Sequence, residues 1–94
     1  MKLRYTTQYK KDIKKLNPDN NLKKIIDEVV DKIRNKETLD PKYKNHKLKG
    51  NMNNFMELHL KPDLLLIYKI DDVNDVLKLI EIGSHSELFK KWFN

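Results

Sequence analysis

The sequence predicts an α+β fold, in which two helices come first in the chain and an antiparallel sheet follows. Apolar residues with helical spacing cover 22–33, and the spacing changes to a period of two from residue 55 onward. Helices followed by consecutive strands pack as a helix pair on one face of a sheet. The 94 residues suffice for one modest core, so we expect residues 1–94 to form a single domain.

The chain is expected to begin with a short strand and a short helix. Residues 2–5 alternate between charged and apolar side chains, as strands do. Apolar residues then recur with helical spacing over 9–16, and Thr6 or Thr7 can serve as the N-cap. The sequence NPDN at 17–20 ends this pattern, because proline and asparagine favour turns.

The second helix has the clearest periodicity in the chain. Its apolar stripe predicts a helix from about 22 to 35, with Asn20 or Asn21 as the N-cap. After the loop around Pro41, residues 55–60 alternate as in a strand with two different faces. The alternation assigns Met56, Leu58 and Leu60 to one side, and Phe55, Glu57 and His59 to the other.

The last two predicted strands form a hairpin. The sequence DLLLIYKI at 63–70 is almost entirely apolar, which is expected of a central strand covered on both faces. Asp71, Asp72 and Asn74 favour a turn, and VLKLIEIG at 76–83 forms the returning strand.

Charge is distributed unevenly along the chain. The formal net charge is +6, and residues 1–50 carry 15 Lys and Arg against 7 Asp and Glu, while 51–94 carry 5 against 7. The basic half is expected to face a polyanion, because such a field favours phosphate backbones; an acidic protein responds to the same field.

Two absences from the sequence exclude whole classes of protein. Without cysteine, the chain has no disulfide, no thiolate metal site and no cysteine nucleophile. The longest apolar run, Leu64–Tyr68, is far too short to span a bilayer, and the N-terminal segment lacks the apolar stretch of a signal peptide. We therefore expect a cytoplasmic protein without a membrane partner.

All three histidines follow the predicted helices, at or near strand ends. They are His46, His59 and His85, and Asp63 follows His59 across the Pro62 turn. If the sheet brings these groups together, imidazoles can accept and donate protons near neutral pH without a metal. Zinc binding and three unrelated surface histidines are the competing interpretations, although no spacing here is typical of a zinc site.

Three segments resemble one known family. YKNHKLKG, ELHLKPDLLLIYKI and GSHSELF, within residues 43–89, are similar to motifs of the YafQ branch of the RelE/ParE superfamily of bacterial toxins. The resemblance implies a RelE-like fold: a short first strand, two helices on one face of a twisted antiparallel sheet, and a short C-terminal helical segment. It implies the toxin of a type II toxin–antitoxin system, a ribosome-dependent endoribonuclease that cleaves translated mRNA and inhibits translation.

The family motifs assign roles to residues of this chain. The resemblance implies functional positions at His46, His59, Asp63, His85 and Phe89, of which the first four are expected to be catalytic and Phe89 to contact RNA. From their place in the chain, Lys47, Lys49 and Glu81 are further expected RNA-contacting residues. In the implied reaction the ribose 2′-OH attacks the adjacent phosphate, so the first step needs no cofactor and no metal. His85 is then the general acid, His59 with Asp63 or His46 supplies the base, and Phe89 stacks on a base.

Two positions depart from the family pattern. The family often has tryptophan where this chain has Leu64, and usually arginine where it has Glu81. Arginine would stabilise the charge developing on phosphate, whereas a carboxylate repels it. Glu81 then acts on His85, serves as another base, weakens the enzyme while Lys47, Lys49 or Lys69 supplies the positive charge, or faces solvent without a role.

The resemblance leaves one alternative function open and implies two partners. The alternative is a non-catalytic or degenerate toxin-fold protein that binds its antitoxin or another protein target. The partners are mRNA on the ribosome and a cognate acidic antitoxin, whose charge would neutralise the basic face.

Overall fold

The centre of the protein is a β-sheet with the strand order β1-β5-β4-β3-β2. In the computed structural model the described part of the chain comprises residues 1–48 and 54–92, without the side chains of 89 and 90. Its elements are β1 (Lys2–Tyr5), α1 (Thr7–Leu16), α2 (Asn20–Arg34), the 3₁₀ helix η1 (Pro41–Tyr43), β2 (His46–Lys47), β3 (Met56–Lys61), β4 (Leu64–Asp71), β5 (Val76–Gly83) and α3 (His85–Trp92). This order confirms the α+β prediction.

The sheet differs from the expected one in its first strand. Strands β2 to β5 pair antiparallel, but β1 pairs parallel with β5, with Lys2 opposite Val76. Parallel neighbours require a crossover connection, and the chain between β1 and β5 contains both long helices and the other three strands. Alternation in a segment of four residues predicts a strand but contains no information about its partner.

Both predicted helices form, and only the second cap differs from the prediction. Helix α1 begins after Thr6, whose hydroxyl accepts a hydrogen bond from the Tyr9 amide at 2.9 Å. The cap of α2 is Asp19, whose carboxylate accepts from the Leu22 amide at 2.8 Å. Asn20 therefore lies inside the first turn, and α2 begins two residues earlier than predicted.

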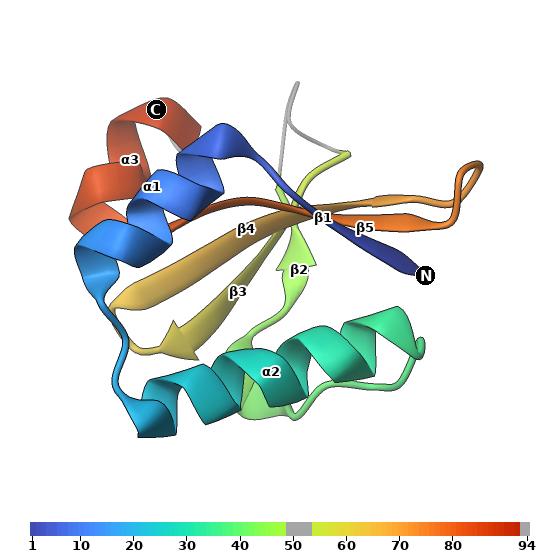
Figure 1. The fold of residues 1–94 in the computed structure, drawn as a ribbon, viewed down its shortest axis with the longest axis horizontal. Helices are drawn as coiled ribbons and strands as arrows, with labels where there is room; N and C mark the ends of the chain where they lie inside the picture. The colour runs from blue at the N-terminus through green and yellow to red at the C-terminus, as the bar shows by residue number, and fades with distance from the viewer. Residues whose placement is uncertain (49–53, 93–94) are drawn as a thin grey trace.

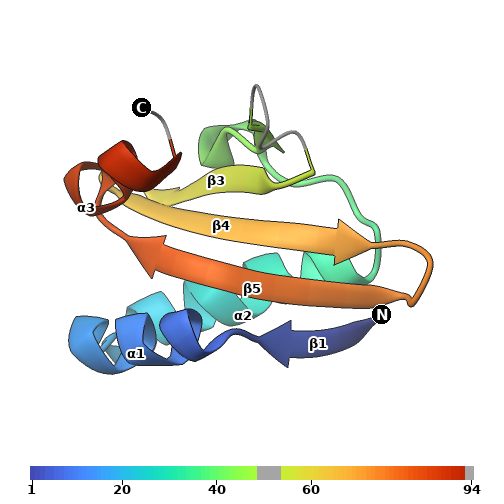
Figure 2. The same ribbon diagram turned by 90° about the horizontal axis from the view of Figure 1, so that it is seen from above.

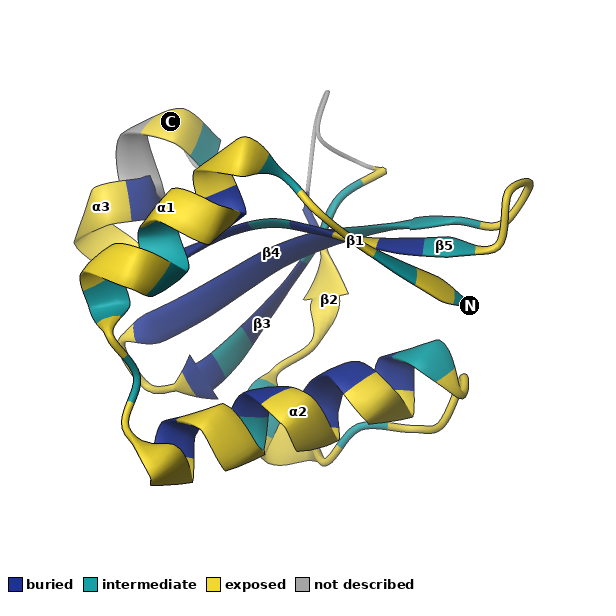
Figure 3. Ribbon diagram, in the orientation of Figure 1, coloured by how far each residue is buried: buried dark blue, intermediate teal, exposed yellow. Residues whose placement is uncertain are grey.

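The main core lies between the helix pair and one face of the sheet. Helix α2 turns its buried stripe toward the sheet and its exposed residues outward, as Figure 3 shows. From the sheet, Leu58, Leu66 and Tyr68 contribute fully buried side chains to this core. Figure 1 shows α2 running along the sheet, with α1 beyond the end of β1.

A smaller core lies on the other face of the sheet, under α3. Leu48, Leu65, Ile67 and Leu88 are buried together, so β4 is covered on both faces as predicted. Figure 2 shows α3 at the end of the sheet where β5 finishes, away from the β4–β5 hairpin. This smaller core attaches α3 to the sheet and so determines where His85 lies. In the described part of the chain no helix has the length and apolarity needed to cross a membrane.

Candidate active site

A buried glutamate joins two of the histidines. Glu57 on β3 is 3% exposed, and its two carboxylate oxygens lie 3.3 Å from His46 Nε2 and 3.0 Å from His59 Nε2. His46 is the register partner of Glu57 on β2, and His59 follows two residues later on the same face of β3. Strand pairing therefore holds both imidazoles on one carboxylate.

The two imidazoles have different polar contacts, and their chemistry differs accordingly. His46 Nδ1 lies 2.7 Å from the Lys44 carbonyl oxygen, so both ring nitrogens of His46 face acceptors. Both contacts are satisfied only when both nitrogens carry a proton. His59 contacts Glu57 through Nε2 alone, which leaves Nδ1 without a partner in the described part of the chain. When the proton of a neutral His59 is on Nε2, beside the Glu57 carboxylate, Nδ1 has a lone pair that can accept a proton.

The segment before His46 is held by a buried tyrosine. The Tyr68 hydroxyl donates to Asn45 Oδ1, and burial raises the pKa of Tyr68 to about 12. The hydroxyl therefore stays protonated and keeps donating at every physiological pH. This bond fixes Asn45 immediately before β2, and so it fixes the start of the strand that carries His46.

His59 also lines a basic cleft at the edge of β3. The cleft has a volume of about 430 Å³, and Lys42, Lys44 and Lys61 are among its lining residues. Lys42 and Lys44 come from η1 and its C-cap. These three lysines give the cleft that His59 lines a positive charge, which suits a phosphate-containing ligand.

His85 lies near a strand end, as predicted, but it belongs to a helix. Strand β5 ends at Gly83, and His85 is the first residue of α3, so the alternation that would place Glu81 and His85 on one side stops at Gly83. The His85 amide donates to Asp63 Oδ1 at 3.2 Å. Asp63 therefore contacts the backbone of His85, and its expected partnership with His59 is replaced by that of Glu57.

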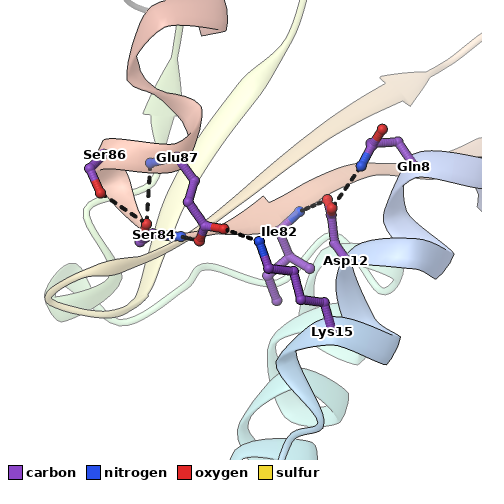
Figure 4. Close-up of polar contacts among 7 residues, drawn as sticks. All are labelled: Gln8, Asp12, Lys15, Ile82, Ser84, Ser86 and Glu87. Carbon is purple, nitrogen blue, oxygen red and sulfur yellow. Dashed lines mark hydrogen bonds and ion pairs between the residues drawn. The ribbon is translucent and has the colours of Figure 1, made fainter.

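A reciprocal hydrogen-bond pair fixes the start of α3, as Figure 4 shows. The Ser84 amide donates to Glu87 Oε1 at 2.9 Å, and the Glu87 amide donates to Ser84 Oγ at 3.2 Å. This is a capping box, with Ser84 as the N-cap and Glu87 three residues later. It orients the first turn of α3, which contains His85.

Helix α1 holds the same region from the other side. Lys15 Nζ lies 3.0 Å from Glu87 Oε2, and Asp12 Oδ2 accepts from the Ile82 amide at 3.0 Å (Figure 4). The hydrogen bonds from Ser84 and then from Lys15 lower the pKa of Glu87 to about 2. The end of β5 and the start of α3 are therefore tied to α1 by two carboxylates.

The sheet register brings two of the histidines toward the same end of the sheet. His59, Leu65 and Gly83 are register partners across β3, β4 and β5. Two strand spacings separate His59 from Gly83, about 10 Å, and His85 begins α3 two residues later. His59 and the first residue of α3, His85, thus lie toward the same end of the sheet, where Asp63 contacts the His85 backbone.

Glu81 faces this side of the sheet and is paired. It is 5% exposed, and its Oε1 lies 2.5 Å from Lys91 Nζ on α3. Glu81 is the register partner of Ile67 in the smaller core. The interpretation of Glu81 as a solvent-facing residue without a role is therefore wrong, and a lysine that sequence analysis did not consider lies where positive charge was expected.

The other described residues considered as RNA contacts or sources of positive charge lie on different sides of the sheet. Lys47 is exposed and pairs with Met56, so the register puts it on the opposite side of the sheet from His46. Lys69 is on the same side as His59, with its Nζ 5.3 Å from the centre of the Phe55 ring. Lys49 and the side chain of Phe89 lie outside the described residues.

The residues that sequence reasoning missed had partial signals. Glu57 is an acid at a position where residues 55–60 alternate, two residues before His59, which places both on one face. The S-x-x-E spacing of Ser84 and Glu87 is the pattern of a capping box. Lys91 had no such signal, because its contact with Glu81 depends on how α3 packs on the sheet. Within the described residues, no group of three His, Asp or Glu side chains has an arrangement that could hold a metal ion.

Solved structures share this fold. A metal-bound toxin from Helicobacter pylori is 42% identical, with a TM-score of 0.85 and coverage of 95% of this chain and 99% of that chain. YafQ in the DinJ–YafQ complex from Escherichia coli is 31% identical, with a TM-score of 0.73 and coverage of 93% and 96%. These likenesses confirm the RelE-like arrangement that the motifs implied.

Sequence comparison agrees with the structures. The mRNA interferase toxin YafQ of Escherichia coli strain K12 is 34% identical over 90 residues, which are 93% of this chain and 94% of that protein. The sequence profile described as "Bacterial toxin of type II toxin-antitoxin system, YafQ" matches residues 1–90. Because this match includes both helices as well as the three histidine segments, the chain belongs to the YafQ family of bacterial type II toxins.

Proposed function

We propose that this protein is an mRNA interferase: an endoribonuclease that cleaves mRNA as it is translated on the ribosome and thereby inhibits translation. Membership of the YafQ family supports the proposal, as does the name of the Escherichia coli relative, mRNA interferase toxin. The observation that carries it is the pair of imidazoles on Glu57, one with an available lone pair and one with both nitrogens facing acceptors. Such a site can accept and donate protons around one phosphodiester.

The base in this proposal is His59. Its Nδ1 removes the proton from a ribose 2′-OH, whose oxygen attacks the neighbouring phosphorus. Glu57 holds Nε2 and fixes the tautomer, as a carboxylate does for the histidine of a catalytic triad. The reaction needs the 2′-OH, so the enzyme cleaves RNA and leaves DNA intact.

The acid is His85. When the bond between phosphorus and the 5′ oxygen breaks, the ring of His85 gives that oxygen a proton, which yields a 5′-OH and a 2′,3′-cyclic phosphate. Asp63 and the capping box hold the backbone at His85, and so they are positioning residues. The proton that His59 gains and the proton that His85 loses balance within the step.

Positive charge for the phosphate comes from several sources in this proposal. His46, with both nitrogens facing acceptors, is one, and the lysines of the cleft beside His59 are others. Lys91 contacts Glu81, and Glu81 occupies the position where family members usually have arginine. The ion pair reduces the repulsion between the Glu81 carboxylate and a phosphate, so Glu81 is compatible with catalysis.

We propose an acidic antitoxin as the protein partner. The Escherichia coli YafQ structures include a complex with the antitoxin DinJ. A net charge of +6 favours an acidic partner segment that covers the basic cleft around His59 and keeps RNA out. Because translated mRNA is the proposed substrate, the proposed place of action is the cytoplasm.

Primer extension on mRNA after induced expression tests the function. Cleavage within translated codons supports the proposal, whereas translation arrest with intact mRNA supports a toxin that only binds its target. Replacing the ribose at one mapped cleavage site by 2′-deoxyribose should abolish the cut at that position. A cut that persists there would exclude attack by the 2′-OH.

A chelator tests the metal-independent mechanism. Two imidazoles can divide the acid and base roles, so cleavage should continue after EDTA treatment of the protein once the magnesium needed by ribosomes is restored. The metal-bound Helicobacter pylori neighbour makes this control necessary. Activity that returned only after zinc or copper was added would show that cleavage depends on a metal, and it would contradict the proton-transfer mechanism.

A further inference from the structure

A row of cations crosses the sheet at the end away from α3. Arg4 on β1 is the register partner of Lys78 on β5, and Lys78 is the partner of Lys69 on β4. Register partners point to the same side of a sheet. Leu3 and Leu77, the next pair along, belong to the main core, so the three cations point to the opposite face, where His59 also lies.

These cations line a groove together with a fourth. Lys2 lies two residues before Arg4 on the same side of β1, and the groove has a volume of about 460 Å³. Lys2, Arg4, Lys69 and Lys78 are called the basic row below. Asp71 is the carboxylate of the groove, and it is engaged by the hairpin: it accepts from the Asn74 side chain and amide, which lower the pKa of Asp71.

The basic row costs the fold stability. Like charges at directly opposite strand positions repel each other, typically by a few tenths of a kcal/mol or more per pair. No residue of the basic row forms an ion pair with a carboxylate in the described part of the chain. An anion bound along the basic row would offset this repulsion.

An aromatic side chain continues the basic row toward the active site. The Lys69 ammonium lies 5.3 Å from the centre of the half-buried Phe55 ring, which itself packs 5.0 Å from the Trp92 ring. A line of cations ending at an aromatic surface is typical of proteins that bind single-stranded nucleic acid, because cations contact phosphates and rings stack on bases.

We propose that the basic row binds the phosphate backbone of the single-stranded RNA that the enzyme cleaves, a few nucleotides from the scissile phosphate. The inference rests on the proposed function, since it concerns the same substrate. Lys69 lies four residues beyond Leu65, the register partner of His59, which is roughly 13 Å along β4. One extended RNA strand on this face can therefore contact both His59 and the basic row.

An RNA strand fits the basic row better than an acidic protein does. Arg4, Lys78 and Lys69 lie on three neighbouring strands at intervals of about 4.8 Å, which gives a line of charge rather than one concentrated patch. A bound peptide also needs apolar pockets for its side chains. Among the described residues that line this groove, Val76 is the one apolar residue.

The test measures binding of uncleavable oligonucleotides by fluorescence anisotropy. Fully 2′-O-methylated strands of increasing length, all centred on one cleavage site, are compared on the wild type and on the double variant Arg4→Gln with Lys78→Gln. Both positions are exposed and make no packing contact with either core. The double variant Lys24→Gln with Lys32→Gln removes equal charge from the exposed side of α2 and is the matched control.

Wild-type affinity should rise with length until the strand reaches the basic row, and the Arg4/Lys78 variant should lose that rise. At 0.1 M salt its affinity for the longest strand should fall about tenfold, and its salt slope should decrease by about 1.4, because each lost phosphate contact contributes about 0.7. Binding of the shortest strand and the melting temperature should not fall. The Lys24/Lys32 control should behave as the wild type.

The binding series would overturn the inference if it showed no length dependence in the wild type, equal losses on short and long strands, or an equal loss in the control. Competition by polyglutamate as effective as that of RNA with the same charge would assign the basic row to an acidic protein and also overturn it. Failure of the proposed function is separate, because it appears as intact unmodified RNA while length-dependent binding of the methylated strands persists.

Discussion

The Glu57 carboxylate contacts the imidazoles of both His46 and His59, so one substitution at Glu57 affects both rings. Glu57→Gln should slow RNA cleavage by about 10-fold or more, because a glutamine offers one acceptor and one donor, so one of the two rings then faces an N–H group. Single-turnover cleavage of ribosome-bound mRNA measures the effect. Glu28→Gln, on the exposed side of α2, is the matched control. Equal cleavage rates for the wild type, Glu57→Gln and Glu28→Gln would show that Glu57 has no role in catalysis.

His85 is expected to act as the proton donor. His85→Ala should reduce cleavage by roughly 10²–10⁴-fold, the usual range for a positioned acid or base. The fold should persist, because His85 is exposed and the capping box uses its neighbours Ser84 and Glu87. Circular dichroism and thermal melting check the fold alongside the rate. A variant that unfolds would assign His85 a structural role.

Glu81 and Lys91 form a pair whose charges can be exchanged. Glu81→Arg alone should destabilise the protein by about 1–3 kcal/mol, since it places two cations together at a buried position. Adding Lys91→Glu should recover most of this free energy by restoring an ion pair. Urea denaturation of both single variants and the double variant gives the coupling energy. Additive effects would show that Glu81 and Lys91 do not interact.

At the scale of elements, the capping box makes α3 sensitive to acid. The pKa of Glu87 falls from its ordinary value of 4.5 to about 2 in the folded protein. A lowered folded-state pKa means that this contribution to stability is complete above about pH 4.5 and is lost as the pH falls toward 2. Glu87→Gln should therefore flatten the stability profile over that range, measured by urea denaturation between pH 2 and 6.

The contribution of Glu87 is modest because its side chain is half exposed and solvent screens the ion pair with Lys15. Glu37→Gln, an exposed acid in the described loop after α2, is the control. If Glu87→Gln followed the wild-type profile throughout, the hydrogen bonds from Ser84 would not persist in solution.

At the scale of the whole molecule, the two cores should respond differently to truncation. Leu66→Ala, in the main core, should cost about 2–5 kcal/mol of unfolding free energy, because it leaves a cavity under the helix pair. Leu88→Ala should cost less, since the smaller core is at one end of the sheet, but it should lower cleavage by loosening α3. Equal loss of stability with full activity in Leu88→Ala would show that α3 does not position His85.

Much of this architecture could be predicted from sequence because local rules determine it. The stripe on α2 and the two-sided burial of β4 follow from side-chain periodicity alone. The parallel partner of β1 could not be predicted, because four residues of alternation fit any sheet edge. The contact between Glu81 and Lys91 could not be predicted either, since it depends on how α3 packs on the sheet through Leu88. The site could be predicted only in part. The motifs contain its histidines, but the partner of His59 is Glu57 and not Asp63.

The pairing of β1 with β5 also determines when the protein can work. Lys2 pairs with Val76, and Lys15 on α1 contacts Glu87 on α3, so segments from opposite ends of the chain must meet before the start of α3 is held in place. Such long-range contacts cannot form on a chain whose last third is still inside the ribosomal exit tunnel. A polypeptide still being synthesised therefore lacks a completed site around His85. If its target is translation, as proposed, the protein can act only after the segment through α3 has left the exit tunnel.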